Sequence, residues 1–221
     1  MALAGLAVAY AAFALTFRGP RARFWQRMTM TGAALGSIAL AGDADLRRPR
    51  LGRRDTGVGL AIAAGLYAVF QVGDRAARRL LPGGEAEIGD IYALRALRPR
   101  PEIALRLAAV IGPAEELFWR GLLQRALCAR VGPAWATACA AAAYGGAHLV
   151  TGNVALIGAA ATAGLYWSVL AALGAPMTAL VVSHVVWDVW IFLVAPTQGE
   201  RPSPAPMSET PAPTDARGRG A

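Results

Sequence analysis

The sequence contains no lysine, only two histidines and only two cysteines, and long stretches of it carry almost no charge. All 22 basic residues are therefore arginine, and together with the high alanine content we attribute this to codon bias. Cys128 lies near the end of one apolar segment and Cys139 within the next, so the two do not suggest a disulfide framework or a zinc knuckle, and we expect small buried thiols. Residues 1–17 lack a basic start, which favours a retained apolar helix over a cleaved signal.

Hydrophobic residues make up 56% of the chain, and the mean hydropathy is +0.41. A soluble domain of this length could not keep so much apolar surface from water, so we predict an integral multi-pass protein of the cell membrane. The arginines gather in blocks, such as residues 18–27 and 47–54, which flank apolar stretches. We therefore attribute the net charge of +8 to contacts of the arginines with the anionic head groups of membrane lipids, and we expect no nucleic-acid partner.

Apolar segments recur along the chain at close to the length that a membrane-spanning helix needs, about 20 residues. They cover residues 2–17, 28–41, 58–72, 103–127, 133–150, 154–174 and 177–195. The predicted fold is all-α, a polytopic transmembrane helix bundle of about seven spans with a buried polar site. The second and third segments are short, so one is tilted, extended or only interfacial. Arginines on both sides of the second segment leave the orientation open.

The chain divides into three predicted parts. Residues 1–100 hold the N-terminal spans and a charged connector, in which residues 88–97 read as an amphipathic surface stretch. Residues 101–195 are predicted to form a helical core. Residues 196–221 are rich in Pro, Ser, Thr and charge, which predicts a disordered tail because such a composition cannot bury a core.

Ionisable residues inside a membrane span cost about 2.5–3.5 kcal/mol each, so each one is a functional hypothesis. The later apolar segments hold six candidates: Glu115, Glu116, Arg120, His148, His184 and Asp188. Residues four apart share a helix face, which pairs Glu116 with Arg120, Tyr144 with His148, and His184 with Asp188. Since lipid cannot solvate such stripes, we expect them to turn inward and to meet in one site.

Pro113 precedes the two glutamates and lacks a backbone N–H, so we expect it to break or kink the span that begins near Ile103. Glu115 and Glu116 would then lie in a first helical turn, where the helix dipole favours negative charge. The alternative is that the two carboxylates lie at the membrane interface and only cap the helix.

On these residues the chain resembles the CPBP intramembrane protease family, which includes the type II CAAX prenyl endopeptidases and the abortive-infection proteins. The family pattern is Glu-Glu-x-x-x-Arg, then Phe-x-x-x-His, then His-x-x-x-Asn or His-x-x-x-Asp. The run from Glu115 to Arg120 matches the first motif completely. His148 matches the second motif with Tyr144 in place of Phe. His184 and Asp188 match the third motif in its His-x-x-x-Asp form. The resemblance covers roughly residues 101–190.

The resemblance implies an intramembrane endopeptidase that hydrolyses a membrane-associated protein or peptide. Glu115 and His148 would hold and deprotonate the attacking water, and Glu116 would pair with Arg120 to fix the helix geometry. His184 and Asp188 would face the oxyanion. An ionised Asp cannot donate a hydrogen bond, so Asp188 is either protonated there or orients His184.

Several alternatives stay open. Zinc is a possible cofactor, because His and Glu are catalytic zinc ligands and the family is also labelled metalloprotease. The absence of a His-Glu-x-x-His run excludes an ordinary zincin helix, and we favour a glutamate mechanism without a cofactor. A non-enzymatic membrane scaffold or a bacteriocin self-immunity partner is the rival function. The Arg- and Ala-rich composition looks bacterial, which favours peptide maturation or self-immunity over prenylated substrates.

Overall fold

The computed structural model describes residues 2–47 and 52–197, which form helices and no strand. The α-helices are α1 (Ala2–Phe17), α2 (Phe24–Gly42), α3 (Arg53–Leu80), α4 (Gly84–Tyr92), α5 (Arg100–Arg106), α6 (Gly112–Glu116), α7 (Arg125–Ala147), α8 (Val154–Ala172) and α9 (Met177–Val189). π-Helical segments are η4 (Leu107–Ile111), η5 (Leu117–Gln124) and η7 (Trp190–Val194). Short 3-10 turns are η1 (Arg21–Arg23), η2 (Ala44–Arg47), η3 (Ala93–Leu97) and η6 (Leu149–Thr151). The predicted all-α class is confirmed.

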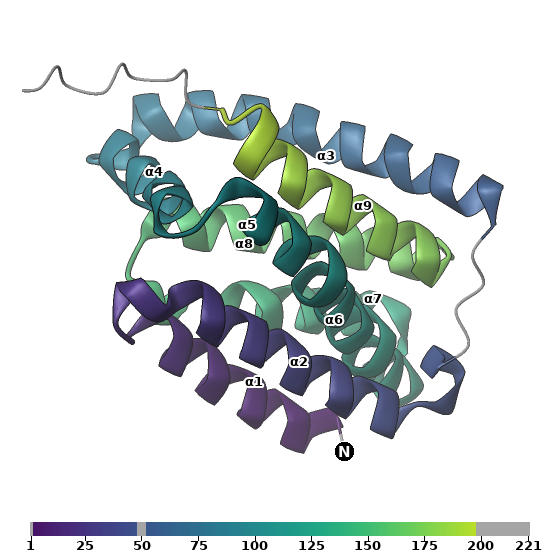
Figure 1. Ribbon diagram of the computed structural model, residues 1–221. Coiled ribbons are helices and arrows are strands. Elements are labelled where there is room, and N and C mark those ends of the chain that lie inside the picture. Colours follow the sequence, from purple (N-terminus) through teal and green to yellow (C-terminus); the bar gives the residue numbers. More distant parts are fainter. Residues whose placement is uncertain (1, 48–51, 198–221) are drawn as a thin grey trace, which may run out of the picture.

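The helices pack side by side as a bundle (Figure 1). α1 and α2 lie together along one side, and α3 and α9 lie together along the opposite side. α6 packs against both α2 and α9, so it lies at the centre of the bundle. Gly59 permits the close approach of α3 to α9, because a Cβ there would lie 2.8 Å from the carbonyl oxygen of Ala179.

One continuous helix runs from α5 through η4, α6 and η5 into α7, because the backbone keeps right-handed helical angles at each junction. It ends at Gly132, where φ is 78° and ψ is 166°, directly before Pro133. α7 is therefore kinked at Gly132, and only its first part belongs to the continuous helix. Of the break or kink expected at Pro113, the break is absent, so the placement of the glutamates in a first helical turn was wrong. The N–H of Gly112 bonds to the carbonyl of Leu107, a wider π-type turn that accommodates the proline ring.

Within the described part of the chain, three helices are long and apolar enough to cross a membrane, judged by length and composition. They cover Arg53–Leu80, Val154–Ala172 and Met177–Val194. α1 is a shorter apolar helix. Each of the other predicted segments falls mainly within a helix, but the count of about seven spans stays a prediction.

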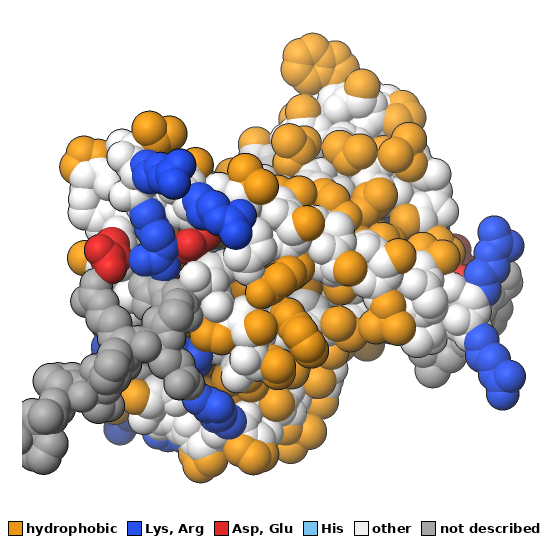
Figure 2. All heavy atoms as spheres, turned by 90° about the horizontal axis from the view of Figure 1, so that it is seen from above, with side chains coloured by type: hydrophobic (Ala, Val, Ile, Leu, Met, Phe, Trp, Pro, Cys, Tyr) orange, Lys and Arg blue, Asp and Glu red, His pale blue; other side chains and the backbone are white. Residues whose placement is uncertain are grey.

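The surface distributes charge as a membrane protein does. Figure 2 shows a broad apolar surface with arginines gathered toward two ends of the molecule. α3 carries Arg53 and Arg54 in its first turn and Arg78 and Arg79 in its last turn. The residues exposed between them include Val58, Leu60, Val69 and Val72. Apolar side chains between two arginine clusters are typical of a helix that crosses lipid with its ends at the head groups.

Three smaller predictions concern the two cysteines, residues 88–97 and the C-terminal tail. Cys139 is exposed and Cys128 is only half-buried, so the expectation of buried thiols was wrong; a thiol is apolar enough to face lipid. The predicted amphipathic stretch at 88–97 corresponds to the end of α4 together with η3, and it buries Ile88 and Tyr92. The predicted disordered tail lies, apart from Pro196 and Thr197, outside the described residues.

Candidate active site

The six predicted site residues come from three regions of the bundle. Glu115 and Glu116 lie in α6 and Arg120 follows in η5; His148 caps the end of α7; His184 and Asp188 lie in α9. All are buried except Asp188, whose side chain is 15% exposed. The structure brings them into two neighbouring clusters, one around Glu116 and one around Tyr144.

The first cluster is centred on Glu116, which is fully buried. Its Oε1 accepts a hydrogen bond of 2.8 Å from Nη1 of Arg120 and lies 2.7 Å from Nδ1 of His184. The Arg120 pair joins two turns of one helix, as the spacing predicted, whereas the His184 contact crosses to α9. A single carboxylate oxygen thus ties the central helix to α9.

Arg120 extends this cluster to α7 and α8. Its Nη2 donates to the carbonyl of Gly164 at 3.1 Å. Its guanidinium lies 4.8 Å from the ring centroid of Tyr144 and 5.3 Å from that of Trp167. These contacts compensate part of the desolvation of a buried cation, because aromatic faces attract positive charge.

The second cluster is centred on Tyr144 in α7. Its hydroxyl donates to Oε2 of Glu115 at 2.8 Å, and its carbonyl oxygen lies 3.0 Å from Nδ1 of His148. A carbonyl can only accept, so Nδ1 carries the hydrogen in this contact, and the neutral ring keeps its lone pair on Nε2. Among residues 2–47 and 52–197, neither Oε1 of Glu115 nor Nε2 of His148 has a hydrogen-bond partner.

Both clusters border one cavity of about 560 Å³. Glu115, Tyr144, His148, His184 and Asp188 line it, whereas Glu116 and Arg120 lie behind its wall. Most of the remaining lining is apolar, and it includes Phe17, Trp25, Phe70, Ile88, Leu156 and Phe192. The cavity therefore combines a few ionisable groups with a long apolar wall, which is typical of a binding site.

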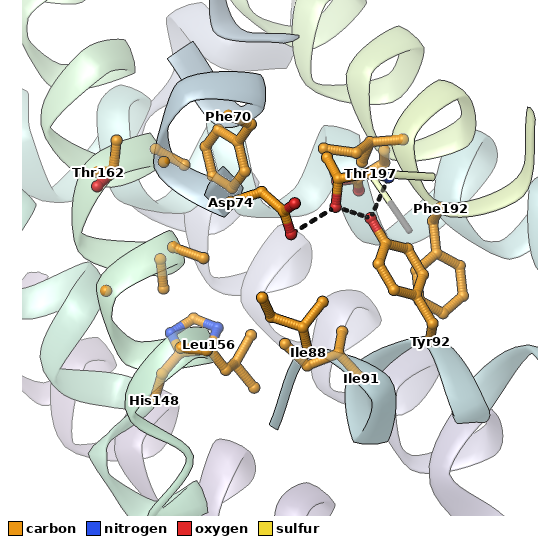
Figure 3. A pocket seen from close by; sticks show the side chains of 18 of the residues that line it. Phe70, Asp74, Ile88, Ile91, Tyr92, His148, Leu156, Thr162, Phe192 and Thr197 are labelled. Atoms are coloured by element: carbon orange, nitrogen blue, oxygen red, sulfur yellow. Dashed lines mark hydrogen bonds between the residues drawn. The ribbon is translucent and has the colours of Figure 1, made fainter. Parts of the chain in front are cut away.

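Figure 3 shows His148 beside Leu156 at one end of this cavity and a second polar group at the other end. There Oγ1 of Thr197 bonds to Oδ1 of Asp74 at 3.0 Å and lies 3.2 Å from the hydroxyl of Tyr92. The segment that follows α9 is thereby attached to α3 and α4. Among the described residues, Asp74 also accepts from Arg78 at 2.8 Å.

His184 is held on three sides. Its ring stacks on Trp167 with centroids 4.1 Å apart and an interplanar angle of 16°. Its Nδ1 faces Glu116, and its Nε2 lies 3.5 Å from Oδ2 of Asp188 at the cavity wall. The ring can therefore neither tilt nor rotate without losing contacts.

The donors do not converge as zinc ligands do. In the part of the chain that the structure describes, no three His, Cys, Asp or Glu side chains are grouped so that they could hold a metal ion. Both nitrogens of His184 face carboxylates, and Glu116 binds Arg120. The arrangement thus does not fit a tetrahedral site of three protein ligands and water.

Two aromatic residues belong to the site although the sequence-based prediction did not include them. Tyr144 had a signal, since it stands four residues before His148 and at the aromatic position of the second motif. Trp167 had none, because nothing in the sequence of α8 shows that this residue lies beneath His184 and Arg120.

Comparison with known families supports the sequence resemblance. Residues 101–190 match a family model described as type II CAAX prenyl endopeptidase Rce1-like. No curated protein and no solved structure matches the chain. The matched segment contains both glutamates, both histidines and the cavity wall that carries them. Over residues 101–190 the chain is thus similar to the Rce1-like family of type II CAAX prenyl endopeptidases.

Proposed function

We propose that the protein is an intramembrane endopeptidase that hydrolyses a peptide bond in a membrane-associated protein or peptide. The observation that carries the proposal is the pair of unpartnered acceptors, Oε1 of Glu115 and Nε2 of His148, on residues that line one cavity. Tyr144 bonds to both residues, so their positions are coupled. A water molecule between such acceptors can donate one hydrogen to each.

In this mechanism Glu115 and His148 hold the attacking water. As the water oxygen attacks the peptide carbonyl, its proton passes to Glu115, which then returns a proton to the leaving amine. His148 accepts the second hydrogen of the water and fixes its direction. The lining of the cavity is mostly apolar, which lowers the local polarity and strengthens these polar contacts.

His184 and Asp188 would stabilise the oxyanion of the tetrahedral intermediate. Nδ1 of His184 bonds to Glu116 at 2.7 Å, whereas Nε2 lies 3.5 Å from Oδ2 of Asp188, which is long for a hydrogen bond. In the positively charged form of the ring, the Nε2–H is therefore the donor left for the oxyanion. A donor fixed in advance, in a site that excludes water, is worth more than the same donor in solution. Glu116 and Arg120 lie behind the wall and would fix His184 and the helix geometry without contacting the substrate.

The geometry favours catalysis over a scaffold role. Polar contacts between spans contribute only about 0.6 kcal/mol on average, which Ser or Asn could supply at lower insertion cost. A scaffold also has no need for acceptors without partners at a cavity wall. The apolar wall supports a membrane-associated substrate, and we propose peptide maturation or self-immunity as the context.

The test compares the parent with Glu115→Ala and His148→Ala. Peptides that accumulate in membranes carrying Glu115→Ala would identify a substrate, whose cleavage is then followed with purified proteins in detergent. We expect both variants to lose cleavage while inserting into the membrane normally, because the water loses its base or its positioning partner. Glu102→Ala is the matched control: it removes a glutamate of the same continuous helix outside the cavity. Cleavage by both site variants at the rate of the parent protein would rule out the proposed site.

A further inference from the structure

Tyr144 occupies the position where the family pattern has Phe, and its additional atom, the hydroxyl oxygen, contacts the proposed base. The hydroxyl donates to Oε2 of Glu115 at 2.8 Å, and the two residues are 29 positions apart in sequence. Phe at this place could not make the contact. The hydrogen bond is therefore a feature of this chain and not of the motif.

The rest of Tyr144 has separate contacts that do not involve the hydroxyl. Its ring lies 4.8 Å from the guanidinium of Arg120 and packs edge-on against Trp119, with centroids 5.4 Å apart. Its backbone carbonyl binds His148. Loss of the hydroxyl alone would leave all three contacts possible, so its contribution can be isolated.

The hydroxyl restricts Glu115 in a way that the cavity alone does not. A carboxylate can rotate about its last torsion and exchange its two oxygens, since that torsion is broad. A hydrogen bond from the buried Tyr144 hydroxyl to Oε2 opposes this exchange, because rotation would strand a buried donor. Oε1 is thereby left as the oxygen that can take a proton from water.

We propose that Tyr144 is a positioning residue that holds Glu115 through Oε2 and directs Oε1 to the attacking water. This inference rests on the proposed peptidase function, because it assigns Glu115 the role of base. Tyr144 acts through Glu115 and not on the substrate. Its hydroxyl should therefore affect the chemical step and not substrate binding.

The decisive variant is Tyr144→Phe, measured beside the parent and Glu115→Ala on a substrate peptide found with Glu115→Ala. We expect kcat to fall roughly tenfold to a hundredfold with KM within about twofold, as for a lost hydrogen bond to a charged group. Tyr10→Phe is the matched control. It removes a tyrosine hydroxyl that donates to Ala143 in the same helix α7, outside the cavity, so its kcat should equal that of the parent.

The outcomes separate the two hypotheses. If Glu115→Ala is inactive and Tyr144→Phe keeps the parent kcat, the positioning role is wrong and the peptidase site stands. If Glu115→Ala itself is fully active, the proposed site fails and the role of Tyr144 fails with it. An equal loss in Tyr144→Phe and Tyr10→Phe, or a raised KM at unchanged kcat, would also overturn the inference, since either indicates a packing effect.

An infrared measurement tests the contact without turnover. The Glu115 carboxyl band, found as the difference between the parent and Glu115→Gln, should shift in Tyr144→Phe and stay in place in Tyr10→Phe. A band that is the same in the parent and in Tyr144→Phe would show that the hydroxyl does not hold this carboxyl group.

Discussion

At the scale of single residues, the buried positive and negative charges of the site can be equal in number. Arg120 and a positively charged His184 match the carboxylates of Glu115 and Glu116 if Asp188 is neutral. An uncompensated buried charge is costly, so this balance favours a protonated Asp188. A protonated carboxyl can donate, and Asp188 lines the cavity beside Nε2 of His184.

We therefore predict that Asp188→Asn keeps most activity, within about a factor of three, because the amide also donates a hydrogen bond and carries no charge. The measurement is kcat across a range of pH for the parent and the variant. If Asp188 is instead an ionised residue that orients His184, the amide would favour the wrong tautomer and lower kcat by about 10⁴-fold at every pH.

At the scale of elements, the continuous helix from α5 to α7 holds the bundle together through Glu116 and Arg120. Glu116 reaches His184 in α9, and Arg120 reaches Gly164 in α8. Tyr144 adds a contact from α7 to Glu115. α8, α9 and the part of α7 after Gly132 are therefore each held by side chains from two successive turns of the central helix.

Loss of either Glu116 or Arg120 should destabilise the fold. Arg120→Leu leaves Glu116 buried with one donor fewer, and we expect unfolding in detergent to become easier by about 3–5 kcal/mol. Arg106→Leu is the matched control, because it removes an arginine of the same continuous helix that pairs with the partly exposed Glu102 and donates to Oγ1 of Thr29. We expect it to cost only about 1–2 kcal/mol. Similar midpoints for the two variants would contradict a buried pair.

At the scale of the whole molecule, the cavity unites parts of the chain that the sequence separates. Its ionisable groups next to the proposed water come from residues 101–190, but Phe17, Phe70 and Ile88 in its apolar wall come from the N-terminal half. Residues from both sides of the predicted boundary near residue 100 thus line the same cavity. The first hundred residues help to enclose the site that the later residues supply.

Metal content is a further property of the whole molecule. Because the donors do not converge on one point, we predict that exhaustive chelation leaves cleavage unchanged and that the active, purified protein lacks stoichiometric zinc. Elemental analysis beside an activity assay is the measurement. Activity that disappears on chelation and returns with Zn²⁺ would show that the side chains rearrange around a metal ion.

The sequence by itself determined the class of fold and the six ionisable candidates. Apolar segments of about 20 residues predict helices, because a helix pairs all of its backbone groups within one segment. Rare charges inside such segments stand out because burying a charge in lipid is costly. Spacing of four residues also predicted the pair Glu116 and Arg120 correctly. These features depend on neighbours in sequence, so no tertiary structure was needed to find them.

Only the tertiary structure decided which side chains from different helices meet. The contacts of Tyr144 with Glu115 and of Trp167 with His184 join residues far apart in sequence. The placement of the glutamates in a first helical turn was likewise wrong, because a π-type turn before Pro113 lets the helix continue. Helix rotation and crossing set these contacts, and both result from packing over the whole bundle, which the periodicity of one helix does not specify.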